Sequence, residues 1–362
     1  MKKFYLAGLL ITLYLSMTVS SCRRPEVEGA IVHFNAGRDD QAYELLIKAT
    51  QTGPTDPEAW YYLGRIQGKK GMVQEMMDSF SKSLSLAKTF QNEIELEKNT
   101  YFGNYYNAGV AAYNSFIKIE DRESEPALKA LNAVIENFGK AKIIKNDFSA
   151  TRLIAIAYGS LKDPVNELKY LEEAAKIVPD TLVAWMGLGY YYMQQKDYVK
   201  AAENFKKGLD IEPNDVEAWT LYAQNLDFGD KKQEAIAAYK VAIEKNPEER
   251  AIPFNLGLLL NKMANAVEDD DAKKNAFYDE AIIYFAKAKE LDPELKDAYD
   301  LLSALLLQRG RYPEAEALLK EGLQRFPESS SIWQNWAFLL ARQGKRAEAE
   351  KAMERSKQLQ DQ

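Results

Sequence analysis

The residue types that most often build catalytic and metal sites are scarce in this chain. Its 362 residues include one cysteine, Cys22, and one histidine, His33. A thiol nucleophile needs a base beside it and a zinc site needs several ligands, so neither can be assembled from the usual groups. The acidic run Glu268 to Asp271 lacks the alternating spacing and turn glycine of a helix-flanked calcium loop, and we interpret it as a solvated loop. We therefore predict no enzyme activity, no cofactor and no metal site.

Cys22 stands at the end of an N-terminal segment with the features of a secretory signal peptide. Two lysines follow Met1, an apolar run extends from Phe4 to Val19, and two serines precede the cysteine. The run is shorter than the roughly 20 residues that a membrane-spanning helix needs. We predict that residues 1–21 are removed by cleavage between Ser21 and Cys22.

The sequence Val19-Ser20-Ser21-Cys22 resembles the lipobox of bacterial lipoproteins. The resemblance implies that the Cys22 thiol is acylated with fatty acids such as palmitate, so that residues 22–26 form a lipidated N-terminus. Two or three acyl chains give durable membrane attachment, because each buried methylene contributes about 0.8 kcal/mol and one chain alone is marginal. The alternative is an ordinary secreted protein in which the cysteine has no such role.

The charge of the mature chain argues against a nucleic acid partner. Removal of Lys2 and Lys3 from the 47 basic residues leaves 45, against 54 acidic residues, a formal net charge of −9. A chain this acidic repels a phosphate backbone.

Prolines recur along the chain at the spacing of a helical repeat. They lie 34, 34, 46 and 34 residues apart, at Pro179, Pro213, Pro247, Pro293 and Pro327. Tryptophans keep step with them at Trp185, Trp219 and Trp333. A fixed period of this size is typical of stacked helical hairpins, which mostly present surfaces to other molecules.

The clearest unit extends from Leu182 to Asp215. Gly189 on its first helix and Ala201 on its second let the two backbones approach closely, and Pro213 ends the second helix. The unit resembles the tetratricopeptide repeat (TPR) pattern almost fully, at Trp185, Leu188, Gly189, Tyr192, Ala201, Phe205 and Pro213.

Neighbouring segments repeat the pattern, more faintly towards the N-terminus. The resemblance implies an all-α fold, a right-handed α-solenoid of about eight TPR helical hairpins, with divergent units over residues 27–147 and regular units over 148–362. The unit that begins at Arg250 fits only if twelve residues, at approximately 264–275, are looped between its helices. This insert explains the single spacing of 46 residues.

In TPR proteins, ligands usually contact defined positions of the first helices that lie away from the packing faces. The partner-binding groove that the resemblance implies is formed by Tyr61, Arg65, Met186, Tyr190, Met193, Phe228, Phe254, Leu258, Asn261 and Phe338. Other groove positions hold Leu307, Gln308, Gln334 and Arg342. Such a surface suits an apolar helix or an extended peptide of a partner protein. The alternative is that some of these aromatic side chains pack between neighbouring first helices.

Together, these features favour a membrane-anchored protein–protein interaction scaffold of the bacterial cell envelope. Its TPR groove would bind a peptide or helix for envelope assembly, secretion or transport. Two alternatives are an accessory subunit of a solute transporter and a surface-exposed adhesin. Arg23 follows the cysteine where aspartate favours inner-membrane retention in enteric bacteria, so the outer membrane is favoured over the inner one.

Overall fold

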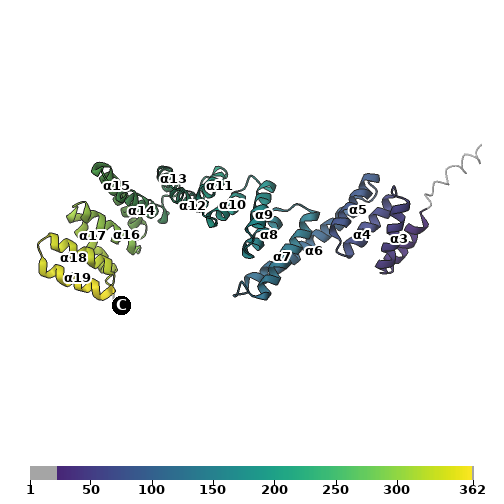
Figure 1. The fold of residues 1–362 in the computed structure, drawn as a ribbon, viewed down its shortest axis with the longest axis horizontal. Helices are drawn as coiled ribbons and strands as arrows, with labels where there is room; N and C mark the ends of the chain where they lie inside the picture. The colour runs from purple at the N-terminus through teal and green to yellow at the C-terminus, as the bar shows by residue number, and fades with distance from the viewer. Residues whose placement is uncertain (1–22, 361–362) are drawn as a thin grey trace, which may run out of the picture. The chain divides into compact units, whose positions relative to one another are not determined.

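The computed structural model describes residues 23–360, so the predicted signal peptide and Cys22 lie outside the described residues. Within 23–360 the chain forms eighteen α-helices and no β-strand. This confirms the all-α fold. The chain divides after Ile177 into two compact units (Figure 1), of which each is a succession of helical hairpins.

The N-terminal unit contains four hairpins. Its helices are α2 (Pro25–Asn35), α3 (Asp39–Thr52), α4 (Pro57–Lys69), α5 (Val73–Leu86), α6 (Gln91–Ile117), α7 (Glu125–Ile144), α8 (Phe148–Ser160) and α9 (Pro164–Ile177). Each odd-numbered helix packs against the even-numbered helix before it, and α3 and α7 also pack against the helices that follow them.

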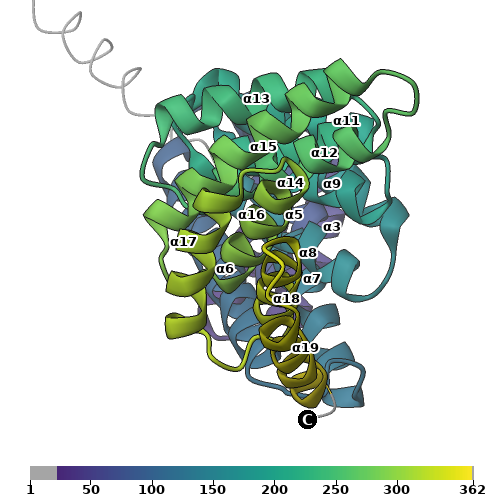
Figure 2. The ribbon, with the colours of Figure 1, turned by 90° about the vertical axis from the view of Figure 1, so that its left-hand side faces the viewer.

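The C-terminal unit contains five hairpins. Its helices are α10 (Leu182–Gln194), α11 (Tyr198–Ile211), α12 (Val216–Phe228), α13 (Lys232–Lys245), α14 (Ala251–Asn265), α15 (Asp271–Leu291), α16 (Lys296–Gln308), α17 (Tyr312–Arg325), α18 (Ser330–Arg342) and α19 (Arg346–Gln360). One hydrophobic core extends from α10 to α18. Figure 2 shows α18 and α19 side by side at the end of this unit. The described residues therefore form nine hairpins in place of the predicted number of about eight.

A glycine on the first helix and a phenylalanine on the second bring the two helices of a hairpin into close contact. A methyl group on Gly189 would lie only 2.4 Å from the nearest ring atom of Phe205. The same arrangement recurs at Gly64 with Phe80, Gly109 with Phe138 and Gly257 with Phe285. All four rings are at most 1% exposed. The missing Cβ thus makes room for the largest side chain at the centre of each hairpin.

The periodic prolines and tryptophans are joined by hydrogen bonds. In four of the five tryptophans the indole Nε1 donates to the carbonyl oxygen of the proline six residues earlier, at 2.8–2.9 Å, in the pairs Trp60–Pro54, Trp185–Pro179, Trp219–Pro213 and Trp333–Pro327. Between Pro213 and Trp219, the Asp215 carboxylate also accepts from the Ala218 N–H and caps α12. The segment between Pro213 and Trp219, which leads into α12, is therefore held by one bond to its backbone carbonyl and one to its aspartate side chain.

The extra residues of the 46-residue spacing are mainly helical, and this corrects the predicted loop at 264–275. Only residues 266–270 separate α14 from α15, and α15 is 21 residues long where α11, α13 and α17 are 14. Asp270 caps α15 by accepting from the Lys273 N–H at 2.9 Å. The buried Tyr278 donates to Asn265 Oδ1 at 2.6 Å and holds the lengthened helix against the end of α14. Likewise, the extra length between Tyr101 and Asp147 extends α6 and α7, which are 27 and 20 residues long.

The contact between Gly189 and Phe205 predicts that Gly189→Ala lowers stability. Alanine is favoured over glycine in a helix by about 1 kcal/mol, but overpacking a filled core costs about 1–3 kcal/mol. The cost of overpacking should exceed the gain in helix propensity, because Phe205 is fully buried and its ring cannot move aside into solvent. The measurement is the urea midpoint by circular dichroism. Gly103→Ala on α6 is the matched control, because no atom lies within 4 Å of its added methyl group, and it should leave the midpoint unchanged or raise it. Equal destabilisation by both changes would contradict this account.

Candidate functional site

Two predicted groove residues of the N-terminal unit, Tyr61 and Arg65, are committed to internal packing. Tyr61 is 6% exposed, and its ring stacks on Phe90 with the centroids 4.5 Å apart. Arg65 lies with its guanidinium 4.5 Å from the Phe34 ring centroid, and its Nε donates to Glu97 Oε1 at 2.8 Å. The prediction that Tyr61 faces a partner is wrong, because residues that follow α5 cover its ring. Arg65 joins α4 to α2 and α6 instead of standing free for a ligand.

The C-terminal unit contains a cavity of about 480 Å³ between the first helices α16 and α18. Seven of its eight lining residues lie on these two helices, and the eighth, Tyr312, is the first residue of α17. Helix α16 contributes Ala304, Leu307 and Gln308, and α18 contributes Gln334, Asn335, Phe338 and Arg342. The predicted groove positions of two successive units therefore meet at one concave surface. The volume falls in the range of ligand-binding clefts, about 300–1,000 Å³.

Phe338 is the main apolar side chain that this cavity offers to a ligand. It is 43% exposed, and the guanidinium of Arg342 lies 4.9 Å from its ring centroid. Leu307, by contrast, is only 5% exposed and contributes a buried apolar wall. The amides of Gln308 and Gln334 are exposed at the rim. An aromatic surface bordered by amides and one cation suits the backbone and apolar side chains of a peptide.

Asn335 serves the fold of this cavity and does not offer its amide donors to a ligand. Its Nδ2 donates to the backbone oxygen of Asp300 at 3.1 Å, to Asp300 Oδ1 at 3.0 Å and to Ser303 Oγ at 3.0 Å. Burial raises the pKa of the Asp300 carboxyl, and the bonds from Ser331 and Asn335 oppose this rise. These bonds fix α18 against α16, the two helices that line most of the cavity.

The other predicted groove residues of this unit divide into two groups by exposure. Phe228 is 59% exposed and Leu258 is 39% exposed, so both present apolar surface to solvent. Half-buried positions are held by Met186, Tyr190, Met193, Phe254 and Asn261. Phe254, for example, packs edge-on against the buried Phe285, with ring centroids 5.6 Å apart.

Tyr190 joins two neighbouring first helices. Its hydroxyl donates to the Glu217 carboxylate on α12, and its ring lies edge-on to Phe205, with centroids 5.6 Å apart. Burial, and then the bond to Glu217, raise the pKa of the Tyr190 phenol to about 12. Tyr190 therefore has a packing role, and only the exposed part of its half-buried side chain is available to a partner.

Sequence reasoning missed Tyr312 in the cavity wall. It is the first residue of α17 and is 36% exposed. The TPR resemblance places groove positions on first helices, and no periodic feature of the sequence marks the start of a second helix as part of the groove. Only the packing of α17 against α16 brings this ring to the cavity.

Among residues 23–360, no group of three or more histidine, cysteine, aspartate or glutamate residues is arranged to hold a metal ion. Over the same range, no helix combines the length and apolar character needed to cross a membrane.

Stacked antiparallel helical hairpins of about 34 residues place the protein in the class of α-helical repeat proteins. Comparison with known families identifies the repeats: the family described as "Tetratricopeptide repeat" matches residues 183–215, and a second description of that name matches residues 278–334 and 306–362. The chain thus contains TPR units, as the residue pattern predicts.

Curated relatives share the repeat at low identity. The chain is 22% identical to the peroxisomal targeting signal receptor of Kluyveromyces lactis, over 64% of this chain and 37% of the receptor. It is 27% identical to the TPR repeat-containing protein YpiA of Bacillus subtilis, over 91% of this chain and 69% of YpiA. Among solved structures, YrrB, titled "a TPR protein with an unusual peptide-binding site", has a TM-score of 0.42 and 21% identity, over 55% of this chain and 96% of YrrB.

The bond from Tyr190 to Glu217 predicts a pH-dependent loss of stability in Tyr190→Phe. The variant keeps the ring contact with Phe205 and loses one hydrogen bond, so at pH 7 it should be less stable by about 1 kcal/mol. A phenol whose pKa is raised in the folded state contributes stability that is present below pH 10 and is lost as the pH rises towards 12. The difference between wild type and variant should therefore shrink over that range.

Urea midpoints at pH 7, 9, 10 and 11 test this expectation. Tyr192→Phe is the matched control, because within the described residues the Tyr192 hydroxyl forms no hydrogen bond. A constant difference between wild type and Tyr190→Phe from pH 7 to 11 would exclude the hydroxyl as its source.

Proposed function

We propose that this protein is a membrane-anchored scaffold that binds a peptide or helix of a partner protein in the TPR groove of its C-terminal unit. The cavity between α16 and α18 is the observation that carries the proposal. Predicted groove residues of two successive repeats line this cavity, and Phe338 is accessible in it. The Asn335 amide is hydrogen-bonded within the protein.

The chemistry of the groove supports a protein partner over a nucleic acid or a charged small molecule. Phe228, Leu258 and Phe338 supply exposed apolar surface on α12, α14 and α18. Large aromatic and apolar side chains carry much of the energy of protein–protein contacts. The acidic balance of the chain disfavours polyanions. One relative is by name a receptor for a targeting signal, which agrees with a ligand that is a segment of another protein.

The membrane anchor in this proposal depends on Cys22 and on the apolar run before it. Acyl chains on this thiol would hold the repeats at the bacterial cell envelope, at the outer membrane in preference to the inner one. The first described helix, α2, begins at Pro25, three residues after the cysteine. Three residues of extended chain span about 10 Å, so the anchored protein would lie close to the bilayer.

Replacement of Cys22 by serine should move the protein from the membrane fraction to the soluble fraction and abolish incorporation of labelled palmitate. The reason is that serine lacks the thiol that would carry the acyl chains, and without these chains no durable anchor remains. The experiment compares wild type with Cys22→Ser in a bacterial host. Ser20→Ala keeps a small residue before the cysteine and should fractionate as wild type. Membrane fractionation and labelling of Cys22→Ser equal to those of wild type would refute the lipid anchor.

A photoreactive amino acid at position 338 should capture a partner protein through the groove. Phe338 is exposed, so the exchange should leave the fold intact. The same amino acid at Ile283, which is 63% exposed on the second helix α15, is the control. We expect discrete crosslinked adducts from position 338 that are missing from position 283. Mass spectrometry of the adduct identifies the captured segment, and identical adducts from both positions would count against groove binding.

A further inference from the structure

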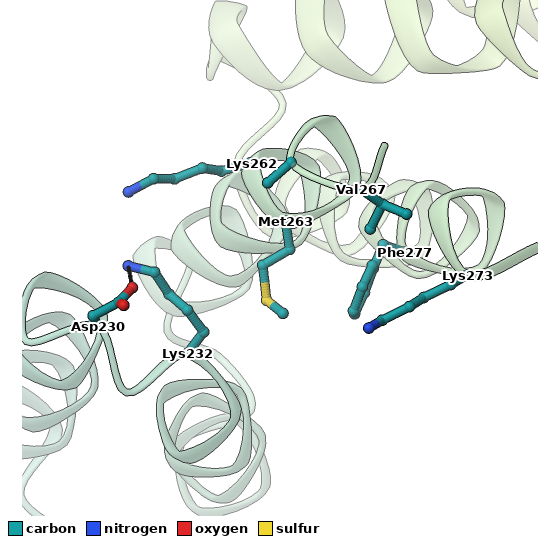
Figure 3. A pocket seen from close by; sticks show the side chains of 8 residues that line it. Asp230, Lys232, Lys262, Met263, Val267, Lys273 and Phe277 are labelled. Carbon is teal, nitrogen blue, oxygen red and sulfur yellow. Dashed lines mark ion pairs between the residues drawn. The ribbon is translucent and has the colours of Figure 1, made fainter. Parts of the chain in front are cut away.

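Charged side chains outside the groove often have their partners within the protein. In a cavity of about 470 Å³ lined by α14 and α15, Lys232 pairs with Asp230 at 3.6 Å (Figure 3). Asp227 pairs with Lys232 as well, and with Lys262 at 3.8 Å. Such pairing leaves little net charge to select a ligand. Two arginines at the start of the described chain are also paired, and their place directly after Cys22 gives this pairing a consequence.

Arg24 fastens the start of α2 to the end of α3. Its Nη1 donates to the Ala49 carbonyl oxygen at 2.8 Å, and its Nη2 donates to Thr52 Oγ1 at 2.6 Å. The guanidinium lies against Gly53, where any Cβ would collide with it. A cation at the C-terminal end of a helix also interacts favourably with the last carbonyl groups and with the helix dipole. The end of α3 thus provides a fitted site for the Arg24 side chain.

Arg23 makes a second connection, to the start of α4. Its Nε donates to Glu58 Oε2 and its Nη2 donates to Glu58 Oε1, both at 2.8 Å. Two parallel bonds hold the planar guanidinium and the carboxylate in one relative orientation. The Arg23 side chain is 48% exposed, so this pair contributes direction more than stability. We call the contacts of Arg23 and Arg24 the N-terminal clasp.

The N-terminal clasp lies at one edge of the first two hairpins. It joins the start of α2, the end of α3 and the start of α4. At the opposite edge, the end of α4 is joined to the start of α3 by the ion pair of Lys69 with Asp39 at 3.0 Å. Helix α3 has 14 residues. Because a helix rises about 1.5 Å per residue, the two edges are about 20 Å apart.

The clasp begins one peptide bond after the cysteine that the proposed anchor requires. Consecutive Cα atoms lie about 3.8 Å apart. Acyl chains on Cys22 would therefore be attached directly beside a residue whose side chain is fixed to α4, and next but one to a residue fixed to α3.

We propose that the N-terminal clasp orients the anchored protein at the membrane. The edge that carries Arg23 and Arg24 faces the bilayer, and the edge that carries Lys69 and Asp39 faces away from it. This inference rests on the proposed lipid anchor. It assigns the two arginines to the fold, although arginines beside a lipidated residue could also contact anionic headgroups.

The test measures energy transfer from a dye on the protein to acceptor dyes on lipid headgroups. The acylated full chain is added to preformed phosphatidylcholine vesicles that contain the acceptor. A donor dye on Thr55→Cys reports on the clasped edge, and one on Ala36→Cys reports on the opposite edge, and both positions are exposed. Cys22 is the only other cysteine and would be acylated, so the dye reacts at the new thiol. Transfer should be more efficient from position 55, which would lie about 20 Å closer to the headgroups.

Loss of the clasp should reduce this difference between the two donors. Arg24→Ala removes both side-chain bonds to α3 and should bring the two transfer efficiencies together. Arg38→Ala is the matched control. It removes the same charge from the opposite edge, where the Arg38 side chain forms no hydrogen bond or ion pair with the described residues, and it should keep the difference.

An exchange of charges separates the clasp from headgroup binding. Arg23→Glu should reduce the difference, and Arg23→Glu combined with Glu58→Arg should restore it, because the ion pair then forms in reverse. Headgroup binding by Arg23 predicts no restoration, since the double variant still lacks the positive charge at position 23. This comparison is repeated with vesicles that contain phosphatidylglycerol.

Flotation of the protein with the vesicles, measured in the same samples, distinguishes failure of the anchor from failure of the clasp. A wild type that does not float would refute the anchor and the orientation with it. A wild type that floats but transfers energy equally from both positions would refute the clasp alone. The same conclusion would follow from equal behaviour of Arg24→Ala and Arg38→Ala, or from a double variant no better than Arg23→Glu. Circular dichroism of each variant checks that its helices are intact.

Discussion

The close contact of a helix backbone with a phenylalanine ring is the constraint on which the hairpins depend. In four hairpins a first-helix glycine faces a buried ring of the second helix, and no side chain larger than hydrogen fits between them. Two helices that approach so closely bury their shared face almost completely, and this burial is the main source of stability in a small helical unit. Hairpins without this pair, such as α16–α17, are held by other contacts, including the bond from Tyr299 to Glu321 at 2.8 Å.

The spacing between hairpins follows from the segments that join them. A proline ends one hairpin, an aspartate such as Asp215 caps the next first helix, and an indole hydrogen bond ties the two together. Because this arrangement recurs, first helices begin at equivalent points and present equivalent positions to the concave surface. The cavity at Phe338 is the consequence, since groove positions of α16 and α18 come to face one another.

One departure from the period has a structural result of its own. The additional residues in the hairpin α14–α15 become helix as soon as Asp270 provides a cap, and Tyr278 then finds a buried partner in Asn265. The lengthened helix carries Lys273 and Phe277 beyond the end of the regular hairpin, where they meet Lys232 and Met263. A surface absent from the regular units arises in this way without disturbance of the core.

The repeat and the helical hairpin could be predicted from the sequence alone, because the 34-residue period and the small residues at fixed places leave few other ways to bury the apolar faces. The sequence pattern did not give the number of hairpins, which is nine within residues 23–360. It also did not distinguish a looped insert from a longer helix, because that depends on the Asp270 cap and on the bond from the Tyr278 hydroxyl to Asn265. Which of the predicted groove side chains are accessible depends on tertiary packing. Tyr61 and Phe338 are both predicted groove residues, yet Phe90 covers the Tyr61 ring while the Phe338 side chain is 43% exposed. The exposure of a groove side chain depends on residues distant in the sequence, such as Glu97, which accepts a hydrogen bond from Arg65 across 32 residues. A local sequence pattern contains no information about such contacts.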